Sequence, residues 1–241
     1  MSRNRFCALS VAGFDPSGGA GILADIKTFE ANKVKGLGVV SAITFQNELE
    51  FTGVEWVSQD SIIKQINIVT KVNNIEFVKI GMIQNADVLD KILDTLTEIN
   101  PKIKIIWDPI LSTSTQYKIH ETFEIDKLQK ICRKIFLITP NMNEIRILMN
   151  ESDTMKAADL LGEYCNVYLK GGHSEKNLGR DYLIFNRKTS VFKAPKISPA
   201  GKHGTGCVLS AGITASLAKG FTIHKACLRA KDYVTNYLFC N

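Results

Sequence analysis

Short, almost wholly apolar runs recur along the chain and alternate with segments in which apolar residues return every three or four positions. The runs span residues 6–13, 37–45, 77–80, 103–107, 136–139 and 166–169. Runs of this length without polar alternation are typical of strands that are buried on both faces of a parallel sheet. The helical repeats begin near residues 22, 62, 88, 145, 209 and 226. The alternation predicts an α/β fold with one doubly wound, largely parallel sheet and helices on both faces.

A different pattern towards the carboxyl end predicts an antiparallel pair of strands at the edge of the sheet. Residues 182–186 and 190–193 flank the turn-forming sequence Asn186-Arg187-Lys188-Thr189. The chain has 241 residues, of which 45% are hydrophobic. This is enough for one substantial core, so we expect residues 1–241 to form a single domain.

Composition narrows the class of partner. The formal net charge is +6, and the lysines are spread along the chain instead of forming a basic tract. Nucleic acid is therefore not indicated, and an anionic small ligand is equally consistent with this charge. The six cysteines include no C-x-x-C pair and no spacing with histidine that suits zinc, which favours free thiols in a reducing cytoplasm. The amino-terminal apolar run meets Asp15-Pro16 before a signal-peptide cleavage pattern develops, and no run approaches membrane-spanning length. We therefore expect a cytoplasmic protein that contacts neither a membrane nor nucleic acid.

The stretch KHGTGC, residues 202–207, carries the clearest chemistry. Gly204 and Gly206 allow a sharp turn with uncovered backbone amides, and a run of helix formers follows at once. The first amides of a helix lack partners within it and carry about half a positive charge, so this turn predicts an anion site. Cys207 lies in the same turn, where the helix dipole is expected to lower the pKa of the thiol and supply a reactive base. The alternative is a glycine-rich turn into a core helix, with Cys207 as a small buried hydrophobic side chain.

The loop after the first run, residues 14–21, is also rich in glycine and opens a helix. It lacks the lysine and hydroxyl of a Walker A loop and the full spacing of a dinucleotide fold, so a tight strand-to-helix turn is an equally good interpretation. Asp25 falls in the first turns of the following helix. It could simply favour the positive helix end, or it could face a pocket at the carboxyl edge of the sheet.

Several predicted strands are followed by side chains suited to binding, at the edge where open α/β sheets bind ligands. Gln46 could pair with a heteroaromatic ring and Met82 could form an apolar wall, although a solvated amide and a core methionine are the commoner cases. Asp108 could organise magnesium or phosphate, and Lys170 could reach a phosphate as a point charge. Glu144 has the spacing of a capping-box residue at a helix start, but it could also hold a metal-bound water.

Taken together, these segments resemble the ribokinase-like superfamily, and within it the hydroxymethylpyrimidine/phosphomethylpyrimidine kinases of thiamine biosynthesis. The matching pieces run nearly end to end: AGFDPSGGAGILADIKTFE, SAITFQN, KIGM, WDPI, TPNMNEIRIL, YLKGGH and HGTGC. The first and last are the specific ones. Sugar kinases of the superfamily usually carry Asp where Cys207 stands, whereas a Cys there resembles the pyrimidine kinases and some pyridoxal kinases. The resemblance implies a ribokinase-like sheet without a separate lid domain, and a homodimer.

The resemblance also implies roles for individual residues. Four are expected to line a pyrimidine pocket: Gly13, Asp25, Gln46 and Met82. Four are expected to bind ATP, with the first two near Mg²⁺ through water: Asp108, Glu144, Lys170 and Thr205. Three are expected to form the anion hole and the base: Gly204, Gly206 and Cys207. The implied reaction moves the γ-phosphoryl group of ATP to 4-amino-5-hydroxymethyl-2-methylpyrimidine and then a second one to the monophosphate. Such a transfer needs alignment and charge stabilisation more than covalent catalysis.

The sequence departs from the family's usual pattern at three places. Residues 112–117 contain no glycine, residues 199–202 lack the usual Asn/Thr-rich approach, and the chain ends at Asn241, soon after the last predicted helix. All three lie near the expected nucleotide. The resemblance therefore implies pyrimidine binding more directly than adenine binding or the second phosphorylation.

Three other functions compete with this hypothesis. A pyridoxal or pyridoxine kinase would act on a similar flat ring, although Gln46 and Met82 favour the aminopyrimidine. A cysteine hydrolase would use Cys207 as nucleophile with His203 or His173 as base, but the acidic residues and the lysine at the strand ends would then have no role. A non-catalytic pyrimidine sensor would keep the ring pocket without efficient use of ATP.

Overall fold

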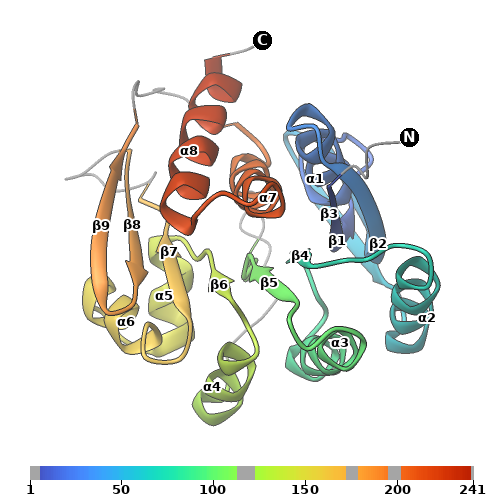
Figure 1. Ribbon diagram of the computed structural model, residues 1–241, viewed down its shortest axis with the longest axis horizontal. Helices are drawn as coiled ribbons and strands as arrows, with labels where there is room; N and C mark the ends of the chain where they lie inside the picture. The colour runs from blue at the N-terminus through green and yellow to red at the C-terminus, as the bar shows by residue number, and fades with distance from the viewer. Residues whose placement is uncertain (1–5, 113–122, 172–178, 195–201, 240–241) are drawn as a thin grey trace.

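The computed structural model describes residues 6–112, 123–171, 179–194 and 202–239. Within them the chain forms one sheet of nine strands, in the order β3-β2-β1-β4-β5-β6-β7-β8-β9 (Figure 1). The strands are β1 (Cys7–Phe14), β2 (Lys35–Gln46), β3 (Phe51–Trp56), β4 (Phe77–Ile80), β5 (Lys104–Trp107), β6 (Leu137–Ile138), β7 (Asn166–Leu169), β8 (Arg180–Phe185) and β9 (Lys188–Lys193). The neighbouring strands β2, β1, β4, β5, β6 and β7 are parallel to one another, whereas β3, β8 and β9 each pair antiparallel with a neighbour. The predicted largely parallel sheet is confirmed, and the described residues include no separate lid.

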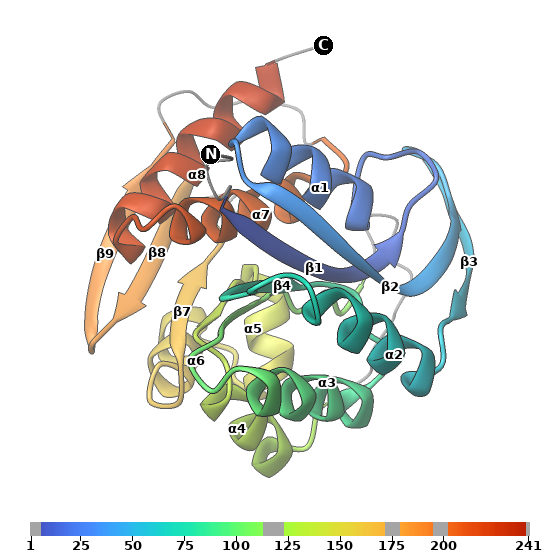
Figure 2. The ribbon, with the colours of Figure 1, turned by 45° about the vertical axis from the view of Figure 1, so that its right-hand side comes forward.

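Helices cover both faces of the sheet. Those described are α1 (Gly21–Ala31), α2 (Gln59–Thr70), α3 (Ala86–Ile99), α4 (Ile125–Arg133), α5 (Met142–Met149), α6 (Thr154–Leu161), α7 (Thr205–Ala218) and α8 (Ile223–Phe239). Helices α1, α7 and α8 lie on one face and α2 to α6 on the other (Figures 1 and 2). The strand order turns back at β1, which has β2 on one side and β4 on the other. Ligands of open α/β sheets bind at such a point, beside the carboxyl ends of the strands.

Helix α7 lies deep in the first of these layers. Every residue from Cys207 to Ala218 is buried, and the helix packs against α1, α8, β1 and β4. The predicted repeat of Leu209, Ile213 and Leu217 lies in it. A helix with apolar residues on all sides is typical of one enclosed by protein. The position of its first turn is therefore fixed by the core.

Some elements differ from the predictions. The sequence pattern does not predict β3, α4 or α6. The edge hairpin is confirmed, but its turn consists of Asn186 and Arg187 alone, with φ of 51° and 58°. Lys188 and Thr189, expected in the turn, belong to β9. Two-residue turns with positive φ match the twist of paired strands, which explains the shorter turn.

Three predictions concern residues outside those that the structure describes: residues 113–117 of the glycine-free loop, His173, and residues 199–201 before the glycine turn. The cysteines that are described are free thiols, as predicted: Cys7, Cys132, Cys165, Cys207 and Cys227. In the described part of the chain, no helix combines the length and the apolar character needed to cross a membrane.

Candidate active site

The first turn of α7 meets the carboxyl ends of several parallel strands at one edge of the sheet. Gly206 lies beside the groups that follow β5 and β7, since a Cβ added to it would be 3.3 Å from Lys170 Nζ and 3.9 Å from Asp108 Oδ2. At the end of β1, a Cβ added to Gly13 would be 3.2 Å from Met82 Sδ. The fold thus gathers predicted site residues that lie far apart in the sequence.

Asp108 is buried at the centre of a polar cluster. Lys170 Nζ lies 2.7 Å from its Oδ1, and the hydroxyls of Thr139 and Ser210 donate to it at 3.2 and 3.1 Å. Burial alone would raise the pKa of Asp108, but the charges of Lys170 and Lys79 and these hydrogen bonds hold it below its usual value. Asp108 is therefore held as a carboxylate. Thr139 and Ser210 are contributors that the sequence interpretation misses.

Glu144 forms the capping box that its spacing predicts. Its Oε2 accepts from the amide of Asn141 at 2.6 Å, while its own amide donates to Asn141 Oδ1 at 2.8 Å. The same carboxylate oxygen lies 3.6 Å from Lys170 Nζ. Burial raises the pKa of Glu144 to about 7, and Lys170 opposes this shift while Asp108 adds to it. Glu144 thus faces the polar cluster around Asp108. Although the Lys170 ammonium lies near it, its carboxyl group is readily protonated.

The glycine turn has the geometry expected for an anion site. Gly204 is the N-cap of α7 with φ of 77°, and a Cβ added to it would be 1.8 Å from the carbonyl oxygen of Gly19. Gly206 and Cys207 lie in the first turn, where backbone amides have no intrahelical partner. Thr205 Oγ1 donates to the carbonyl of Lys202 at 2.5 Å. The Thr205 hydroxyl is thus engaged with Lys202, whereas the amides of Gly206 and Cys207 have no partner within the helix.

Cys207 is placed as predicted, but the expected effect on its pKa is wrong. Cys207 is 6% exposed and lies in the first turn of α7. Burial raises the pKa of the thiol to about 11, while the charge of Lys79 opposes the rise. The local dipole of α7 predicts a lowered value because it takes no account of desolvation, which is the larger effect here.

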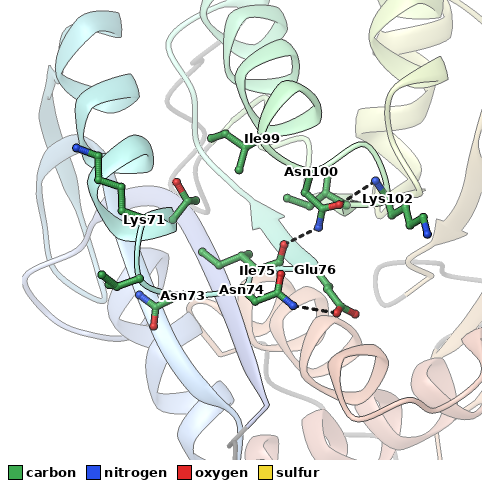
Figure 3. A pocket seen from close by; sticks show the side chains of 11 residues that line it. Lys71, Asn73, Asn74, Ile75, Glu76, Ile99, Asn100 and Lys102 are labelled. Carbon is green, nitrogen blue, oxygen red and sulfur yellow. Dashed lines mark hydrogen bonds between the residues drawn. The ribbon is translucent and has the colours of Figure 1, made fainter.

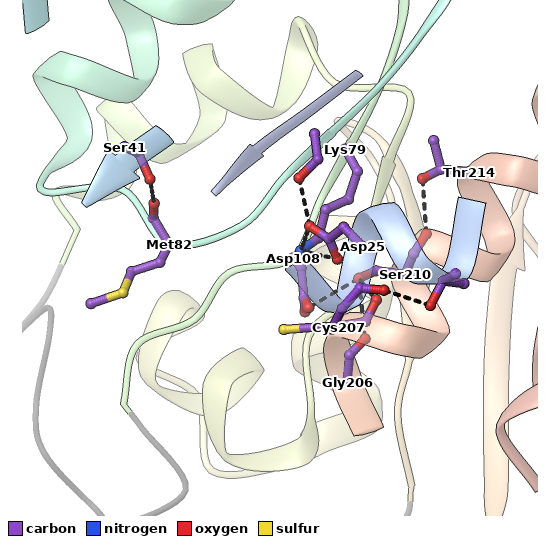
Figure 4. Close-up of polar contacts among 12 residues, drawn as sticks. Asp25, Ser41, Lys79, Met82, Asp108, Gly206, Cys207, Ser210 and Thr214 are labelled. Atoms are coloured by element: carbon purple, nitrogen blue, oxygen red, sulfur yellow. Dashed lines mark hydrogen bonds and ion pairs between the residues drawn. The ribbon is translucent and has the colours of Figure 1, made fainter. Parts of the chain in front are cut away.

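Asp25 does not line an open pocket in this structure. It is fully buried, and both of its oxygens accept from Lys79 Nζ, at 3.0 and 2.8 Å. Ser10 Oγ donates to Oδ2 at 2.6 Å. Burial raises the pKa of Asp25, and the ammonium of Lys79 and the Ser10 hydroxyl oppose this. Figure 4 shows the group beside Asp108 and Cys207.

The expected ring side of the site is formed by the ends of β1 and β2 and the residues after β4. Met82 is buried, and its carbonyl accepts from Ser41 Oγ at 2.6 Å. Figure 4 shows Met82 to one side of the polar cluster, on the side to which the sulfur of Cys207 points. Gln46 is the last residue of β2 and is partly exposed. Gly13 adjoins Met82 as described above, so three of the four residues expected to line the ring pocket lie at the carboxyl ends of neighbouring strands.

A contact between distant segments joins the two glycine-rich turns. Asp15 accepts from the amides of Ser17 and Ala20, at 2.9 and 2.8 Å, and lies 3.1 Å from His203 Nε2. Because His203 precedes Gly204, this contact holds the first loop against the start of α7. The sequence interpretation considers His203 only as a base for a hydrolase, and it does not pair it with Asp15.

A hollow of about 760 Å³ lies at the opposite edge of the sheet (Figure 3). It is lined by the carboxyl ends of α2 and α3 and the residues before β4 and β5. Its amide side chains serve local structure: Asn74 Nδ2 donates to Glu76 Oε1, and Asn100 Nδ2 donates to the carbonyl of Ile75. None of the predicted site residues line this hollow. It is therefore not the candidate site.

The carboxylates near Lys170 suit a magnesium ion better than a protein-only metal cage. No group of three or more metal-binding side chains occurs among the described residues. Mg²⁺ usually keeps several waters and uses one or two carboxylates together with substrate phosphates. Asp108 and Glu144 converge on one cation, the Lys170 ammonium, at 2.7 and 3.6 Å. The oxygen donors therefore fit Mg²⁺ that arrives with a nucleotide.

Comparison with known proteins gives consistent results. Residues 15–240 match the family model described as phosphomethylpyrimidine kinase. A hydroxymethylpyrimidine/phosphomethylpyrimidine kinase of Aquifex aeolicus is 34% identical over 95% of this chain and 92% of its own length, and that of Bacillus subtilis is 33% identical over 94% and 87%. The crystal structure of phosphomethylpyrimidine kinase from Clostridium difficile 630 has a TM-score of 0.79 and 31% identity, covering 97% of this chain and 100% of that one. An ADP complex of Bacillus subtilis pyridoxal kinase has a TM-score of 0.82 at 26% identity, covering 96% and 91%.

Proposed function

Because the chain belongs to the phosphomethylpyrimidine kinase family, we propose that it transfers the γ-phosphoryl group of ATP to hydroxymethylpyrimidine, and then a second one to the monophosphate, in thiamine biosynthesis. It is a small-molecule kinase of the ribokinase-like fold. The observation that carries the proposal is the convergence of Gly206, Lys170 and Asp108 at the first turn of α7. This arrangement offers backbone amides and a cation to one phosphate group, and it places a carboxylate beside them that could hold Mg²⁺.

We assign the anion hole to the amides of the α7 turn and the base to Cys207. In the transfer, the bond between the alcohol oxygen of the substrate and the γ-phosphorus forms, and the bond from the γ-phosphorus to ADP breaks. The alcohol proton passes to the thiolate of Cys207. The amides of Gly204, Gly206 and Cys207 would stabilise the charge on the transferred group, which is the main catalytic requirement of phosphoryl transfer.

We assign the nucleotide side to Lys170, Asp108, Glu144 and Thr205. Lys170, now paired with Asp108 and Glu144, would exchange part of this contact for the ATP phosphates. Asp108 and Glu144 would then hold Mg²⁺, in part through water. Bound Mg²⁺ supplies positive charge that neutralises the phosphate oxygens.

We assign the pyrimidine to the side of the cluster formed by Gly13, Gln46 and Met82. A side chain at Gly13 would crowd the Met82 sulfur, since an added Cβ would be 3.2 Å from it, and the Gln46 amide can donate and accept at once. Asp25 belongs behind this face, since it is fully buried. Its contribution to binding would be electrostatic or would require a shift that uncovers it.

Product analysis by mass spectrometry tests the proposal. Purified protein is incubated with Mg-ATP and hydroxymethylpyrimidine, with pyridoxal in a parallel reaction. We expect the monophosphate and diphosphate of the pyrimidine, and a severe loss of both with Cys207→Ala. Binding of the pyrimidine without any phosphorylated product would overturn the proposal in favour of a sensor.

Pyridoxal kinase is the second candidate, favoured by the structural similarity to the Bacillus subtilis enzyme. The two substrates share a flat ring with a hydroxymethyl group, so the parallel reaction decides between them. If kcat/KM were higher for pyridoxal than for hydroxymethylpyrimidine, pyridoxal would be the preferred substrate.

We also propose that the protein works in the cytoplasm, as one domain and as a homodimer. Free cysteines, five of them among the described residues, favour a reducing compartment. Ile43 and Phe45 on β2 are exposed apolar side chains that a second copy could cover. Light scattering coupled to gel filtration measures the mass, and a monomer at micromolar concentration would refute the dimer.

A further inference from the structure

A fully buried ion pair lies behind the proposed base. Lys79, in β4, and Asp25, in α1, both have side-chain exposures of 0%, and the ammonium meets both carboxylate oxygens, at 3.0 and 2.8 Å. Ser10 Oγ, in β1, adds a third donor to Asp25. Such a pair is weak evidence for stability, because desolvation of the two charges offsets their attraction.

The ion pair lies close to the turn that carries Cys207. The start of α7 packs against the residues that lead into α1, since a Cβ added to Gly204 would be 2.9 Å from Ala20 Cα, and Asp25 lies in the second turn of α1. Lys79 Nζ lies against Gly81, where an added Cβ would be 2.9 Å from it. Gly81 precedes Met82 of the ring side. Figure 4 shows Lys79, Asp25 and Cys207 as neighbours.

The groups around Cys207 nearly cancel in charge. Titratable or charged groups interact with the thiol from each element packed around it: Asp25 from α1, Lys79 from β4, Asp108 after β5, Lys170 after β7 and Tyr237 from α8. Lys170 is paired with Asp108, so Lys79 is the cation that offsets Asp25. Without it, a buried carboxylate would oppose both a thiolate and an anionic phosphoryl group.

We propose that Lys79 is a positioning residue for the kinase reaction, whose buried ammonium offsets the charge of Asp25 behind Cys207 so that Cys207 can lose its own proton and, as the thiolate, take the proton of the substrate alcohol. The proposal rests on the proposed function only in naming Cys207 as the base. Charge near a thiol acts on its reactivity whether or not a substrate is present. The proposal can therefore be tested without kinase turnover.

The test measures the alkylation rate of Cys207 by iodoacetamide at several values between about pH 7 and 9, with peptide mass spectrometry to identify the site. Cys7, at the start of β1, serves as internal reference. Below the pKa of the thiol, the rate is proportional to its thiolate fraction. The variants are Lys79→Met, Asp25→Asn and the double variant, each checked for cooperative urea unfolding.

Opposite effects of the two single variants separate this role from a structural one. Lys79→Met should slow the alkylation of Cys207 about tenfold or more, whereas Asp25→Asn should accelerate it by a similar factor. The double variant should return close to the wild-type rate. A pair that only joins α1 to β4 predicts changes in the same direction for both single variants, and that result, or no change in either, would overturn the proposal.

A second measurement keeps the proposal testable if Lys79→Met does not fold. Asp25→Asn, which keeps the size of the side chain, is then compared with Lys79→Arg, which keeps the charge. Faster alkylation in Asp25→Asn with the wild-type rate in Lys79→Arg supports the charge role, whereas a change in the same direction in both, or no change in Asp25→Asn, overturns it. In the kinase assay, Lys79→Met should lower kcat about tenfold or more with less change in KM. Shifted alkylation in a protein that forms no phosphorylated product would defeat the proposed function and leave only the effect of Lys79 on the Cys207 thiol standing.

Discussion

Replacing Gly204 by alanine should damage the catalytic turn more than the same change at a matched glycine. Gly204 has φ of 77°, and its added Cβ would lie 1.8 Å from Gly19 O, whereas real Cβ atoms essentially never come within 3.0 Å of another atom. The two backbones would therefore have to separate by about 1.2 Å. Gly220, beyond the other end of α7, has φ of 83° with nothing within 4 Å of its added Cβ. An alanine at Gly220 would therefore meet the same backbone strain without a collision.

The expected magnitudes follow from this difference. Positive φ costs a residue with a Cβ about 1–2 kcal/mol, so Gly220→Ala should lose about that much free energy of unfolding. Gly204→Ala should lose about 1–3 kcal/mol more, which is typical of forced overpacking. A displacement of about 1 Å in an aligned site lowers the rate on the order of 100-fold. We therefore expect kcat to fall about 100-fold in Gly204→Ala and to stay near wild type in Gly220→Ala.

Urea unfolding and steady-state kinase assays check both variants side by side. Equal losses of stability would show that the close contact with Gly19 is relieved without cost. Normal kcat in Gly204→Ala would refute the assignment of this turn as the anion hole, because an amide cradle displaced by that distance cannot keep its alignment.

Three further outcomes are expected. Since burial raises the pKa of Cys207 to about 11, kcat of the wild type should rise about tenfold per pH unit between about pH 7 and 9. Cys207→Ala should be at least about 100-fold slower and show no such rise. If kcat of the variant rose with pH in parallel with the wild type, the thiol would be excluded as the base. Burial also raises the folded-state pKa of Glu144 from 4.5 to about 7, so its stabilising contribution is complete below about pH 4.5 and is lost as the pH rises through about 7. Against Glu144→Gln, which keeps a capping-box side chain, the wild type should therefore lose up to about 3 kcal/mol of unfolding free energy between about pH 5 and 8, and a constant difference in urea unfolding would contradict this. Asp181→Ala should lower the free energy of unfolding by about 3–5 kcal/mol, because the buried carboxylate accepts from Lys231, Tyr168 and the Gly171 amide. Replacement of the exposed Asp159 by alanine is the control, and equal urea midpoints for the two variants would refute the effect.

The fold is largely predictable because most strands are short, uniformly apolar runs. The prediction for β4 agrees at both ends with the structure. Strand β3 is missed because Phe51–Trp56 is only half-buried and contains glycine. Helix α4 is different, since Leu128, Ile131 and Cys132 are buried at helical spacing, and closer inspection of that spacing would predict it.

Within the site, sequence reasoning finds residues whose roles depend on local geometry. The capping box of Glu144 and the helix start at Gly204 are of this kind. It misses partners that only the tertiary fold provides, such as His203 and Asp15, which are 188 positions apart. Lys79 does leave a signal, because a lysine within the buried run FVKI needs a partner. The pKa of Cys207 is mispredicted because desolvation depends on neighbours that no local pattern contains.

Because α7 is buried, we expect the site to lose its structure only when the whole protein unfolds. Helices with few buried contacts can unfold and refold alone, whereas segments in the core exchange their amide hydrogens only when the entire protein opens. The residues from Cys207 to Ala218 are all buried, so the anion turn has no local route to disorder through its own helix. Heat inactivation should therefore coincide with global melting, and a stabilising change in the layer of α1, α7 and α8 should extend activity to the same temperature as the fold.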